Sequence, residues 1–261
     1  MVYENIIYPT NHLIKQYIRS FWILKSDVRD PYLLPPDKYL HLILSYKSNT
    51  TIIKNGNISN SVTGSFIVGM RTSPVFLLPD GDVEYLGIEF YPYGLRPFLD
   101  FNCAGITNTF LEISVLQNEL NEALKPVVNE IYSDEKRIEI IEQRLLTLLH
   151  KIPVSPDKRM VSAFNIIEKN NGLIPVNKIC DNIGVSARQL NRDFEKFIGV
   201  SPKFYSRIVR FNYFLENIKG LSNFKSFADL AYYCGYTDQA HMIHECTDFT
   251  GVTPAELLNK L

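Results

Sequence analysis

The chain has 261 residues, of which 46% are hydrophobic and 21% are charged, and its formal net charge is -1. This length allows a sizeable core and more than one domain, while the near-neutral total means that any affinity for nucleic acid must come from a local basic surface. No apolar run approaches a membrane span and the N-terminus lacks the form of a signal peptide, so we expect a cytoplasmic protein with no membrane partner.

Short β-rich runs dominate residues 1–105. They are HLILSY, TIIKNGNI, SFIVGM, VFLLPD and DVEYLGIEFY. Asn55-Gly56 and Asp80-Gly81 stand between such runs and favour hairpin turns. Closely spaced strands with turns of this kind predict a sandwich or a barrel. The inward side chains either form a packed core, which we expect, or line a pocket. The aromatic candidates are Trp22, Phe66, Phe76, Phe90 and Tyr91.

Two amphipathic helices are predicted within residues 106–152, at 111–131 and 137–152, with Ser133-Asp134 as the break between them. Their apolar stripes are Ile113, Leu116, Leu120 and Leu124 in the first helix and Ile138, Ile141, Leu145 and Leu148 in the second. Such helices either cover the β-rich domain or contact a second copy of the chain. Pro153 and Pro156 disfavour further helix, so we interpret residues 153–157 as an interdomain linker.

One pattern occurs twice in residues 158–261, at about 176–197 and 227–249. In each copy an apolar helical stripe ends at a glycine, and a polar residue able to cap a new helix follows two places on. These pairs are Gly184 with Ser186, and Gly235 with Thr237. A second stripe then ends at a further glycine. Its members are Leu190, Phe194 and Phe197 before Gly199, and Met242, Cys246 and Phe249 before Gly251. Each copy predicts a helix-turn-helix, and a helix from about 202 to 217 joins them.

The second helix of the first copy carries the side chains that reading a DNA groove requires. Its apolar stripe faces the core, which leaves a polar face toward a partner. That face consists of Ala187, Arg188, Asn191, Arg192 and Glu195. Arginine and asparagine suit the edges of guanine and adenine. The basic residues gather between 185 and 210, where Lys196, Lys203, Arg207 and Arg210 complete the electrostatic footprint.

Residues 158–261 resemble the DNA-binding part of the AraC/XylS family of bacterial transcription regulators. The first motif matches the family pattern at Ser186, Leu190, Arg192, Phe194, Gly199, Ser201, Pro202, Tyr205 and Arg210. The second matches at Ala231, Gly235, Tyr236, Asp238, Gly251, Thr253 and Pro254. It departs from the pattern at His244, where arginine is usual, at Cys246, where phenylalanine is usual, and at Thr247, which replaces a common lysine.

The resemblance implies an α+β protein: an N-terminal cupin-like β-barrel with a helical hairpin, followed by an all-α double helix-turn-helix. Segments PPDKYLHLIL, GSFIVGMRT and LGIEFYPYGLRPFL resemble the sensor domain of part of the family. The resemblance implies a homodimer, with a dimer contact at the hairpin, double-stranded DNA as partner, a small-molecule effector or protein partner at the barrel, and a contact with RNA polymerase. The expected DNA-binding residues are Ala187, Arg188, Asn191, Arg192, Lys196, Arg207, Arg210, Gln239, Ala240, His241 and His244. For Arg210, the alternative to a DNA contact is a structural role in the helix that joins the two motifs.

The second motif is poor in cations. From residue 227 to the end, the only basic residue is Lys260, against five acidic ones. Phosphate contacts need cations, so we expect this motif to supply sequence choice or weak docking while the first supplies the grip. His241 and His244 lie one turn apart, and DNA binding is expected to strengthen as the pH falls and the imidazoles gain charge. Alternatively, the motif does not touch DNA and serves as a brace or as a polymerase contact.

Two rival functions remain open. A cupin-like scaffold also hosts metalloenzymes, but their sites need several converging histidines and carboxylates, and only His12 and His41 lie in this segment. We assign no catalytic residue, metal or cofactor. Cys234 and Cys246 near the second-motif histidines suggest a zinc set, yet they lie on core stripes and are interpreted as structural. The other rival is a regulator gated by a protein partner without a small-molecule ligand.

Overall fold

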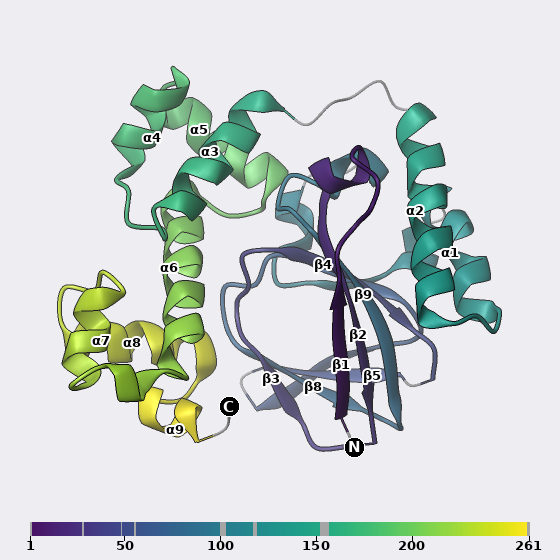
Figure 1. Cartoon of the computed structure of the whole chain (residues 1–261), viewed down its shortest axis with the longest axis horizontal. Coiled ribbons are helices and arrows are strands. Elements are labelled where there is room, and N and C mark those ends of the chain that lie inside the picture. The colour runs from purple at the N-terminus through teal and green to yellow at the C-terminus, as the bar shows by residue number, and fades with distance from the viewer. Residues whose placement is uncertain are drawn as a thin grey trace.

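The computed structural model describes a β-rich N-terminal part beside a helical C-terminal part (Figure 1). The described residues are 2–27, 29–47, 49–54, 56–99, 103–116, 119–151 and 157–259. The predicted α+β class is therefore confirmed. In the part of the chain that the structure describes, none of the helices combines the length and the apolar composition needed to span a bilayer.

The strands form two antiparallel sheets. The larger sheet has the order β1 (Val2–Ile7), β2 (Ile18–Ser26), β9 (Val83–Phe90), β4 (Leu40–Ser45), β7 (Phe66–Val68) and β10 (Phe110–Glu112). The smaller sheet has the order β3 (Tyr32–Leu34), β8 (Val75–Pro79), β5 (Thr50–Lys54) and β6 (Asn57–Val62). A core that draws on both sheets lies between them. The cupin-like domain is thus a two-sheet structure whose sheets do not close into one barrel within the described residues.

Of the two predicted hairpin turns, one is wrong. Strands β5 and β6 pair across Gly56, which has the left-handed φ of 75° that favours glycine, although Asn55 lies outside the described residues. Asp80 and Gly81 instead carry the chain from the smaller sheet to the larger, because β8 pairs with β3 and β5 whereas β9 pairs with β2 and β4. The Asp80 carboxylate accepts hydrogen bonds from the Asn49 backbone and side chain, both at 2.9 Å, so it holds a neighbouring loop.

Alternation along the larger sheet separates its two faces. In β2, Phe21 and Ile23 join the core on the helical side, whereas Trp22 and Leu24 face the smaller sheet. Gly87 of β9 lies opposite Trp22 of β2, and a β-carbon on Gly87 would lie 1.8 Å from the indole. Glycine therefore makes room for the one tryptophan of the chain, which reaches the space between the sheets.

Helices α1 (Glu119–Asn129) and α2 (Asp134–Lys151) cover the outer face of the larger sheet (Figure 1). The predicted start of the first helix at residue 111 is wrong. Leu111 pairs with Ile67 in the sheet, and residues 113–116 form a 3-10 turn whose first amide bonds Ser65. The apolar stripes are buried within this same chain: Leu120, Leu124, Ile138, Ile141, Leu145 and Leu148.

The predicted double helix-turn-helix is confirmed. Its helices are α3 (Lys158–Lys169), α4 (Val176–Ile183), α5 (Ala187–Phe197), α6 (Pro202–Ile218), α7 (Phe227–Tyr233), α8 (Gln239–Thr250) and α9 (Pro254–Leu258). Helix α6 connects the α4–α5 unit to the α7–α8 unit (Figure 1). Ser186 caps α5 as predicted, but the cap of α8 is Asp238 and not Thr237. The inserted residue of the second copy therefore precedes the cap.

An aromatic cluster joins the two parts of the molecule. Tyr91 and Tyr93 stack at 5.7 Å between ring centroids, and Tyr91 meets Phe164 of α3 at 5.5 Å. At the end of α5, the Thr107 hydroxyl donates to the Gly199 carbonyl at 2.8 Å. One continuous apolar cluster extends from the larger sheet into the helix-turn-helix units. The helical part is thus packed directly on the β-rich part.

Candidate functional site

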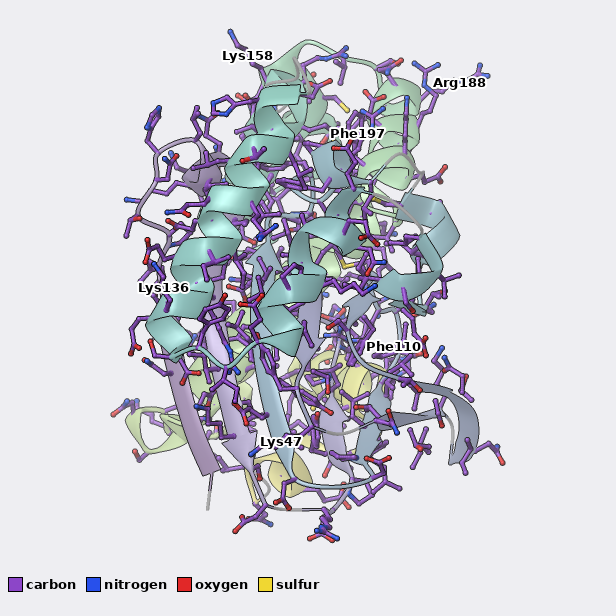
Figure 2. The ribbon with its side chains drawn as sticks, turned by 90° about the vertical axis from the view of Figure 1, so that its right-hand side faces the viewer. Lys47, Phe110, Lys136, Lys158, Arg188 and Phe197 are labelled. Atoms are coloured by element: carbon purple, nitrogen blue, oxygen red, sulfur yellow. The ribbon has the colours of Figure 1, made fainter. Side chains whose placement is uncertain are left out.

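The polar face of α5 is exposed as the sequence predicts. Ala187, Arg188, Asn191, Arg192 and Lys196 are exposed, while the apolar stripe of the helix faces the core. Figure 2 shows Arg188 projecting away from the molecule. The Arg192 guanidinium donates to Gln189 at 2.6 Å, which holds it on the helix surface. Ser186 caps α5 and α4 packs against it, so the exposed cationic and amide side chains of α5 lie on one fixed surface.

Arg207 and Arg210 of the joining helix are tied to the second unit. The carboxylate of Glu245 on α8 accepts from Arg207 Nε at 2.8 Å and from Arg210 Nη2 at 2.7 Å. Burial alone would lower the pKa of Arg210, but the hydrogen bond and charge of Glu245 raise it above its ordinary value. Glu245 is only 2% exposed. We call this cluster, Arg207, Arg210 and Glu245, the α6–α8 clamp. The clamp shows that one acidic residue of the second motif, Glu245, binds the two arginines of α6.

The predicted residues on α8 divide into two groups. Gln239, Ala240 and His244 are exposed. His241 is half-buried, with its Nε2 3.5 Å from Arg210 Nη2 and its ring edge-on to Tyr236. His241 therefore borders the α6–α8 clamp, while the other three face outward.

The cysteines of the second unit lie in the core. Cys234 and Cys246 are fully buried, and burial raises the pKa of Cys234 to about 12 and that of Cys246 to about 11. Metals bind the thiolate, which such burial disfavours. The alternative zinc set with His241 and His244 is not among the groups of described side chains close enough to share an ion.

A cavity of about 300 Å³ lies between the two sheets. Trp22 lines it, whereas Phe66 and Phe90 belong to the solid core and Tyr91 lies at the interface with α3. The apolar part of its lining includes Trp22, Leu24, Leu34, Ile43 and Leu77. Its polar end is formed by Arg19, Ser20, Asp37, His41, Arg71 and Glu89. The domain interior is thus neither solid throughout nor purely apolar.

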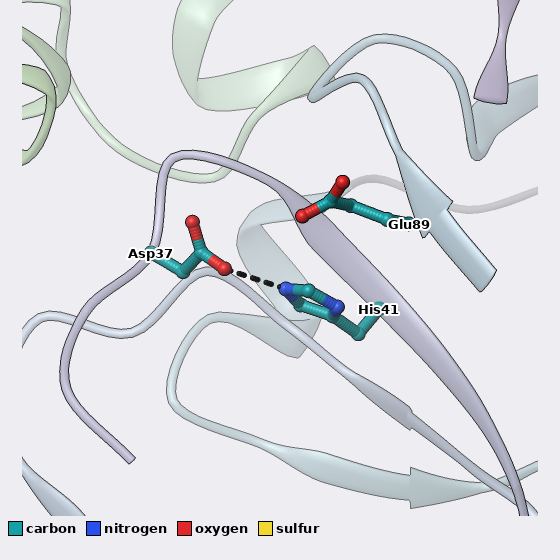
Figure 3. A group of neighbouring side chains, drawn as sticks. All are labelled: Asp37, His41 and Glu89. Atoms are coloured by element: carbon teal, nitrogen blue, oxygen red, sulfur yellow. Dashed lines mark hydrogen bonds and ion pairs between the residues drawn. The ribbon is translucent and has the colours of Figure 1, made fainter. Parts of the chain in front are cut away.

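Hydrogen bonds at both ring nitrogens fix the tautomer of His41 at this polar end, and Figure 3 shows the one to Asp37. The Trp22 indole donates to His41 Nδ1 at 3.3 Å. Since an indole can only donate, Nδ1 accepts and Nε2 carries the proton, which it donates to Asp37 at 2.7 Å. Burial alone would raise the pKa of Asp37, but this hydrogen bond and the charge of nearby Arg71 lower it to about 2.

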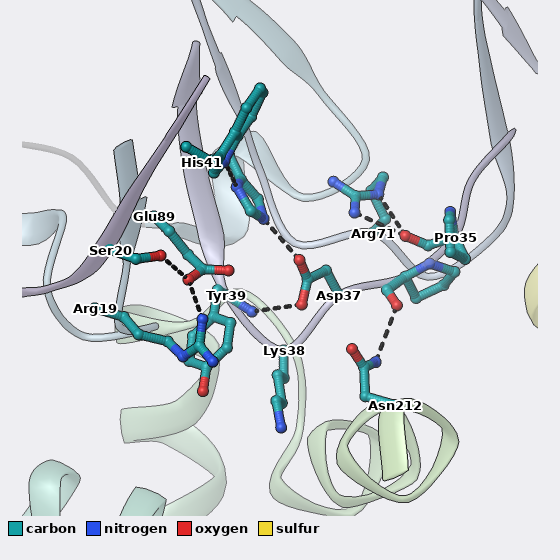
Figure 4. Close-up of polar contacts among 12 residues, drawn as sticks. Arg19, Ser20, Pro35, Asp37, Lys38, Tyr39, His41, Arg71, Glu89 and Asn212 are labelled. Carbon is teal, nitrogen blue, oxygen red and sulfur yellow. Dashed lines mark hydrogen bonds and ion pairs between the residues drawn. The ribbon is translucent and has the colours of Figure 1, made fainter. Parts of the chain in front are cut away.

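The strand register brings the remaining polar groups together. Ser20 and His41 both lie opposite Glu89 on adjacent strands. Glu89 Oε2 accepts from Arg19 and from Ser20, each at 2.6 Å. Arg71 is 2% exposed and donates through Nε and Nη2 to the carbonyl of Pro35, at 3.1 and 2.7 Å (Figure 4). Burial lowers the pKa of Arg71 to about 10.

Asp37, His41 and Glu89 carry groups of the kind that bind metal ions. One ligand atom from each lies within 4.8 Å of the others, and within the described residues this is the one such group. However, the two carboxylates already face two arginines, Arg19 and Arg71. A divalent cation would bring uncompensated positive charge into a buried site, so these residues do not fit one well.

Sequence reasoning named His41 but missed Asp37, Arg71 and Glu89 as site residues. Each of the three lies in one of the segments that resemble a sensor domain, and Arg71 and Glu89 are isolated charges within apolar runs. A buried charge needs a partner or a function, so that interruption was the available signal. Their convergence depends on strand order, which the sequence alone does not show.

Comparisons with known proteins agree with this architecture. A helix-turn-helix domain family matches residues 179–260, and a domain family of unknown function matches residues 6–112. The HTH-type transcriptional regulator ArgR of Pseudomonas aeruginosa is 26% identical over 159 residues, which are 60% of this chain and 47% of that protein. The chain thus spans about half the length of this curated relative.

Solved structures of ToxT from Vibrio cholerae share the fold. One at 1.65 Å resolution has a TM-score of 0.51 and 16% identity, covering 92% of this chain and 98% of that chain. Another, bound to an unsaturated fatty acid, has a TM-score of 0.51 and 14% identity, covering 92% and 95%.

Residues 179–260 thus match a helix-turn-helix domain family, and the chain shares its fold with ToxT. Together with the motifs in both helix-turn-helix units and the curated relative above, these similarities support an AraC-family transcription regulator.

Proposed function

We propose that the protein binds duplex operator DNA chiefly through the exposed face of α5 and that its N-terminal domain senses an effector. The observation that carries the first part is the exposure of Arg188, Asn191 and Arg192 on one face of a capped helix. Arginine and asparagine in a major groove can form paired hydrogen bonds with guanine and adenine. The basic residues Arg207 and Arg210 support this surface indirectly, by fixing α8 against α6.

The second unit contributes sequence choice more than attraction to phosphate. Its outward positions Gln239, Ala240 and His244 carry amide, methyl and imidazole groups. None of these is a fixed cation, so counterion release, which drives the non-specific part of DNA binding, belongs to the first unit.

Operator affinity tests the DNA-binding proposal. An operator is first selected from a random duplex library with the full chain, and affinities are then measured by fluorescence anisotropy. Arg188→Ala or Arg192→Ala should cost about 1–3 kcal/mol wherever the side chain meets a base edge. Arg144→Ala, an exposed arginine on α2, serves as the matched control. Unchanged affinity in both α5 variants would overturn the assignment.

We assign the domains as a sensor at 1–105, a helical hairpin at 106–152, a linker at 153–157 and a DNA-binding domain at 158–261. Residues 152–156 of this division lie outside the described residues. The cavity supports a small-molecule effector, as does the fatty acid bound to ToxT, which has the same fold. Gating by a protein partner is the rival. Capture of a small molecule from metabolite extracts by the full chain, lost on filling the cavity with Leu24→Phe, distinguishes the two.

We further propose that the chain acts as a homodimer and contacts RNA polymerase. The apolar stripes of the hairpin are buried within the chain, so a dimer contact would use the hairpin's outer side. Ile131, at the turn between α1 and α2, is 99% exposed. Sedimentation of the full chain should show a dimer that Ile131→Asp weakens, and a monomer at all concentrations would overturn this contact.

A further inference from the structure

The polar end of the cavity carries separated charges that balance. At this end, Asp37 and Glu89 supply two negative charges, and Arg19 and Arg71 supply two positive ones. The third carboxylate of the lining, Glu4, is exposed to solvent and is not a member of this buried group. His41 is in its neutral form in this hydrogen-bond network, because its Nδ1 accepts from the Trp22 indole. A ligand that enters without upsetting this balance must itself carry no net charge, since an uncompensated charge in a buried site is costly.

One nitrogen of the Arg71 guanidinium, Nη1, keeps its N–H groups free of any described residue at this end. Its Nε and Nη2 both bond the Pro35 carbonyl, whereas Nη1 has no hydrogen-bond partner among the described residues. The side chain is almost completely buried and lines the cavity. A buried guanidinium bonded only to a neutral carbonyl favours an incoming carboxylate, because charge-assisted hydrogen bonds are the strongest available to it.

Glu89 offers a free acceptor on the other side. Both of its hydrogen bonds, from Arg19 and Ser20, go to Oε2, and Oε1 has no partner within the described part of the chain. The residue is 8% exposed. Figure 4 shows Arg71 and Glu89 on opposite sides of Asp37, so the free donor and the free acceptor flank a central carboxylate.

We propose that this cavity binds a small zwitterion of the α-amino-acid class with an apolar side chain, a proposal that rests on the effector-sensing function above. Its carboxylate contacts Arg71 Nη1, and its ammonium lies between Glu89 and Asp37. Its side chain fills the apolar part beside Trp22, Leu24 and Ile43. A ligand with a carboxylate but no ammonium group would leave the Glu89 acceptor unpaired and add negative charge. A ligand with an ammonium group but no carboxylate would leave Arg71 Nη1 unpaired and add positive charge.

The same residues connect the cavity to the DNA-binding part. The segment from Pro35 to Tyr39 borders the cavity at Asp37 and reaches α6 through its backbone (Figure 4). Asn212 donates to the Pro36 carbonyl at 3.2 Å, and the Tyr205 hydroxyl donates to the Lys38 carbonyl at 3.1 Å. A ligand held by Asp37 and Arg71 therefore shifts a segment bonded to the helix that joins the two helix-turn-helix units.

Calorimetric titration of the full chain without DNA tests the ligand class. The probes are L-leucine, L-methionine and L-phenylalanine, each paired with the carboxylate that lacks its amino group and the amine that lacks its carboxyl group. At least one amino acid should bind, and its two analogues should bind weaker by about a hundredfold or more, because each leaves a buried polar group unpaired. Absence of binding by all three, or equal binding of an analogue, would overturn the proposal.

Variants localise the binding to this cavity. Glu89→Gln should weaken the amino acid by a similar factor, whereas Glu122→Gln on the exposed side of α1 should leave it unchanged. Leu24→Phe, which fills the apolar part and keeps every charge, should also abolish binding, and circular dichroism verifies that each variant is folded. Retained affinity in a folded Leu24→Phe chain would contradict the assignment of the cavity.

Operator affinity separates this proposal from the DNA-binding proposal. The bound amino acid should change operator affinity in the unmodified chain, and Asn212→Ala should reduce that change without altering amino-acid affinity. An unchanged operator affinity with bound amino acid would contradict the coupling. Loss of operator binding by the ligand-free chain would instead refute the DNA-binding proposal, whatever the titration shows.

Discussion

The two helix-turn-helix units share a backbone plan but distribute charge in opposite ways. In both, a left-handed glycine ends the first helix and a polar residue caps the second. The α4–α5 unit leaves its arginines exposed, whereas the α7–α8 unit buries Glu245 against two arginines of α6. Apolar stripes and caps therefore determine the repeated fold, while the surface positions are free to differ in function.

The α6–α8 clamp is the feature of this comparison with the largest expected effect. Glu245→Ala would leave Arg207 and Arg210 without their counter-charge, and breaking a buried pair in this way costs about 3–5 kcal/mol. Because Arg207 is one-third exposed, we expect about 3 kcal/mol in the free energy of unfolding, measured in urea. Asp248→Ala, which removes a carboxylate that is 45% exposed, should cost less than about 1 kcal/mol. Equal losses in the two variants would show that the clamp does not hold the units together.

Exchange of side chains at equivalent positions tests whether charge explains why α5 should contribute more to DNA affinity than α8. Arg192 and His244 occupy the same place in the two units, one inserted residue taken into account. Arg192→His should weaken operator binding by about 1–3 kcal/mol. His244→Arg should strengthen it and increase the salt dependence by about one counterion, because it adds a cation near the backbone. A His244→Arg variant with unaltered affinity and salt slope would mean that α8 lies away from DNA.

The sequence predicted the repeated unit better than the contacts between units. The spacing of apolar residues and the glycines located both motifs, because these signals lie within one or two helical turns along the sequence. The misplaced cap at Thr237 shows the limit of matching two copies when one contains an insertion. The acidic residues of the second motif indicated weaker phosphate contact, but the partner of Glu245 lies on another helix, and a pairing of that kind is not visible as local periodicity.

The N-terminal site was less predictable for the same reason. Turn propensity at Asp80-Gly81 correctly indicated a change of direction but could not say which strands pair afterward. Asp37, Arg71 and Glu89 come from three separate segments, and only strand order brings them to one end of a cavity. Arg71 and Glu89 are isolated charges within apolar runs, but the sequence does not show that they lie near each other and near Asp37.

The two caps offer a symmetrical test with a smaller effect. Ser186 accepts a hydrogen bond from the Gln189 amide at 3.1 Å, and Asp238 accepts one from the His241 amide at 2.8 Å. Replacing either residue with alanine should cost about 1 kcal/mol of unfolding free energy, as measured by denaturation. Thr237→Ala is the control. Because Thr237 precedes the cap, its replacement should lower the unfolding free energy by only about a few tenths of a kcal/mol. A larger loss at Thr237 than at Asp238 would contradict the observed start of α8.

The smallest expected effect concerns pH and the two histidines of α8. A proton on His241 would place charge beside Arg210 and so oppose the α6–α8 clamp, although Glu245 partly offsets it. The His244 side chain is 78% exposed, and its Nδ1 lies 3.5 Å from a carboxylate oxygen of Asp248, away from the α6–α8 clamp. Any strengthening of DNA binding at lower pH should therefore come from His244 alone.

Operator affinity at pH 7.5 and pH 6 in the single variants distinguishes these contributions. We expect the unmodified chain to bind at most about fivefold more tightly at the lower pH, since an exposed charge pair contributes at most about 1 kcal/mol. His244→Ala should remove the difference and His241→Ala should keep it. If His241→Ala removes it instead, His241 must leave the clamp to reach the DNA, and the exposed and buried groups of this helix would have to be reassigned. The second unit would then resemble the first more closely in function than its charge indicates.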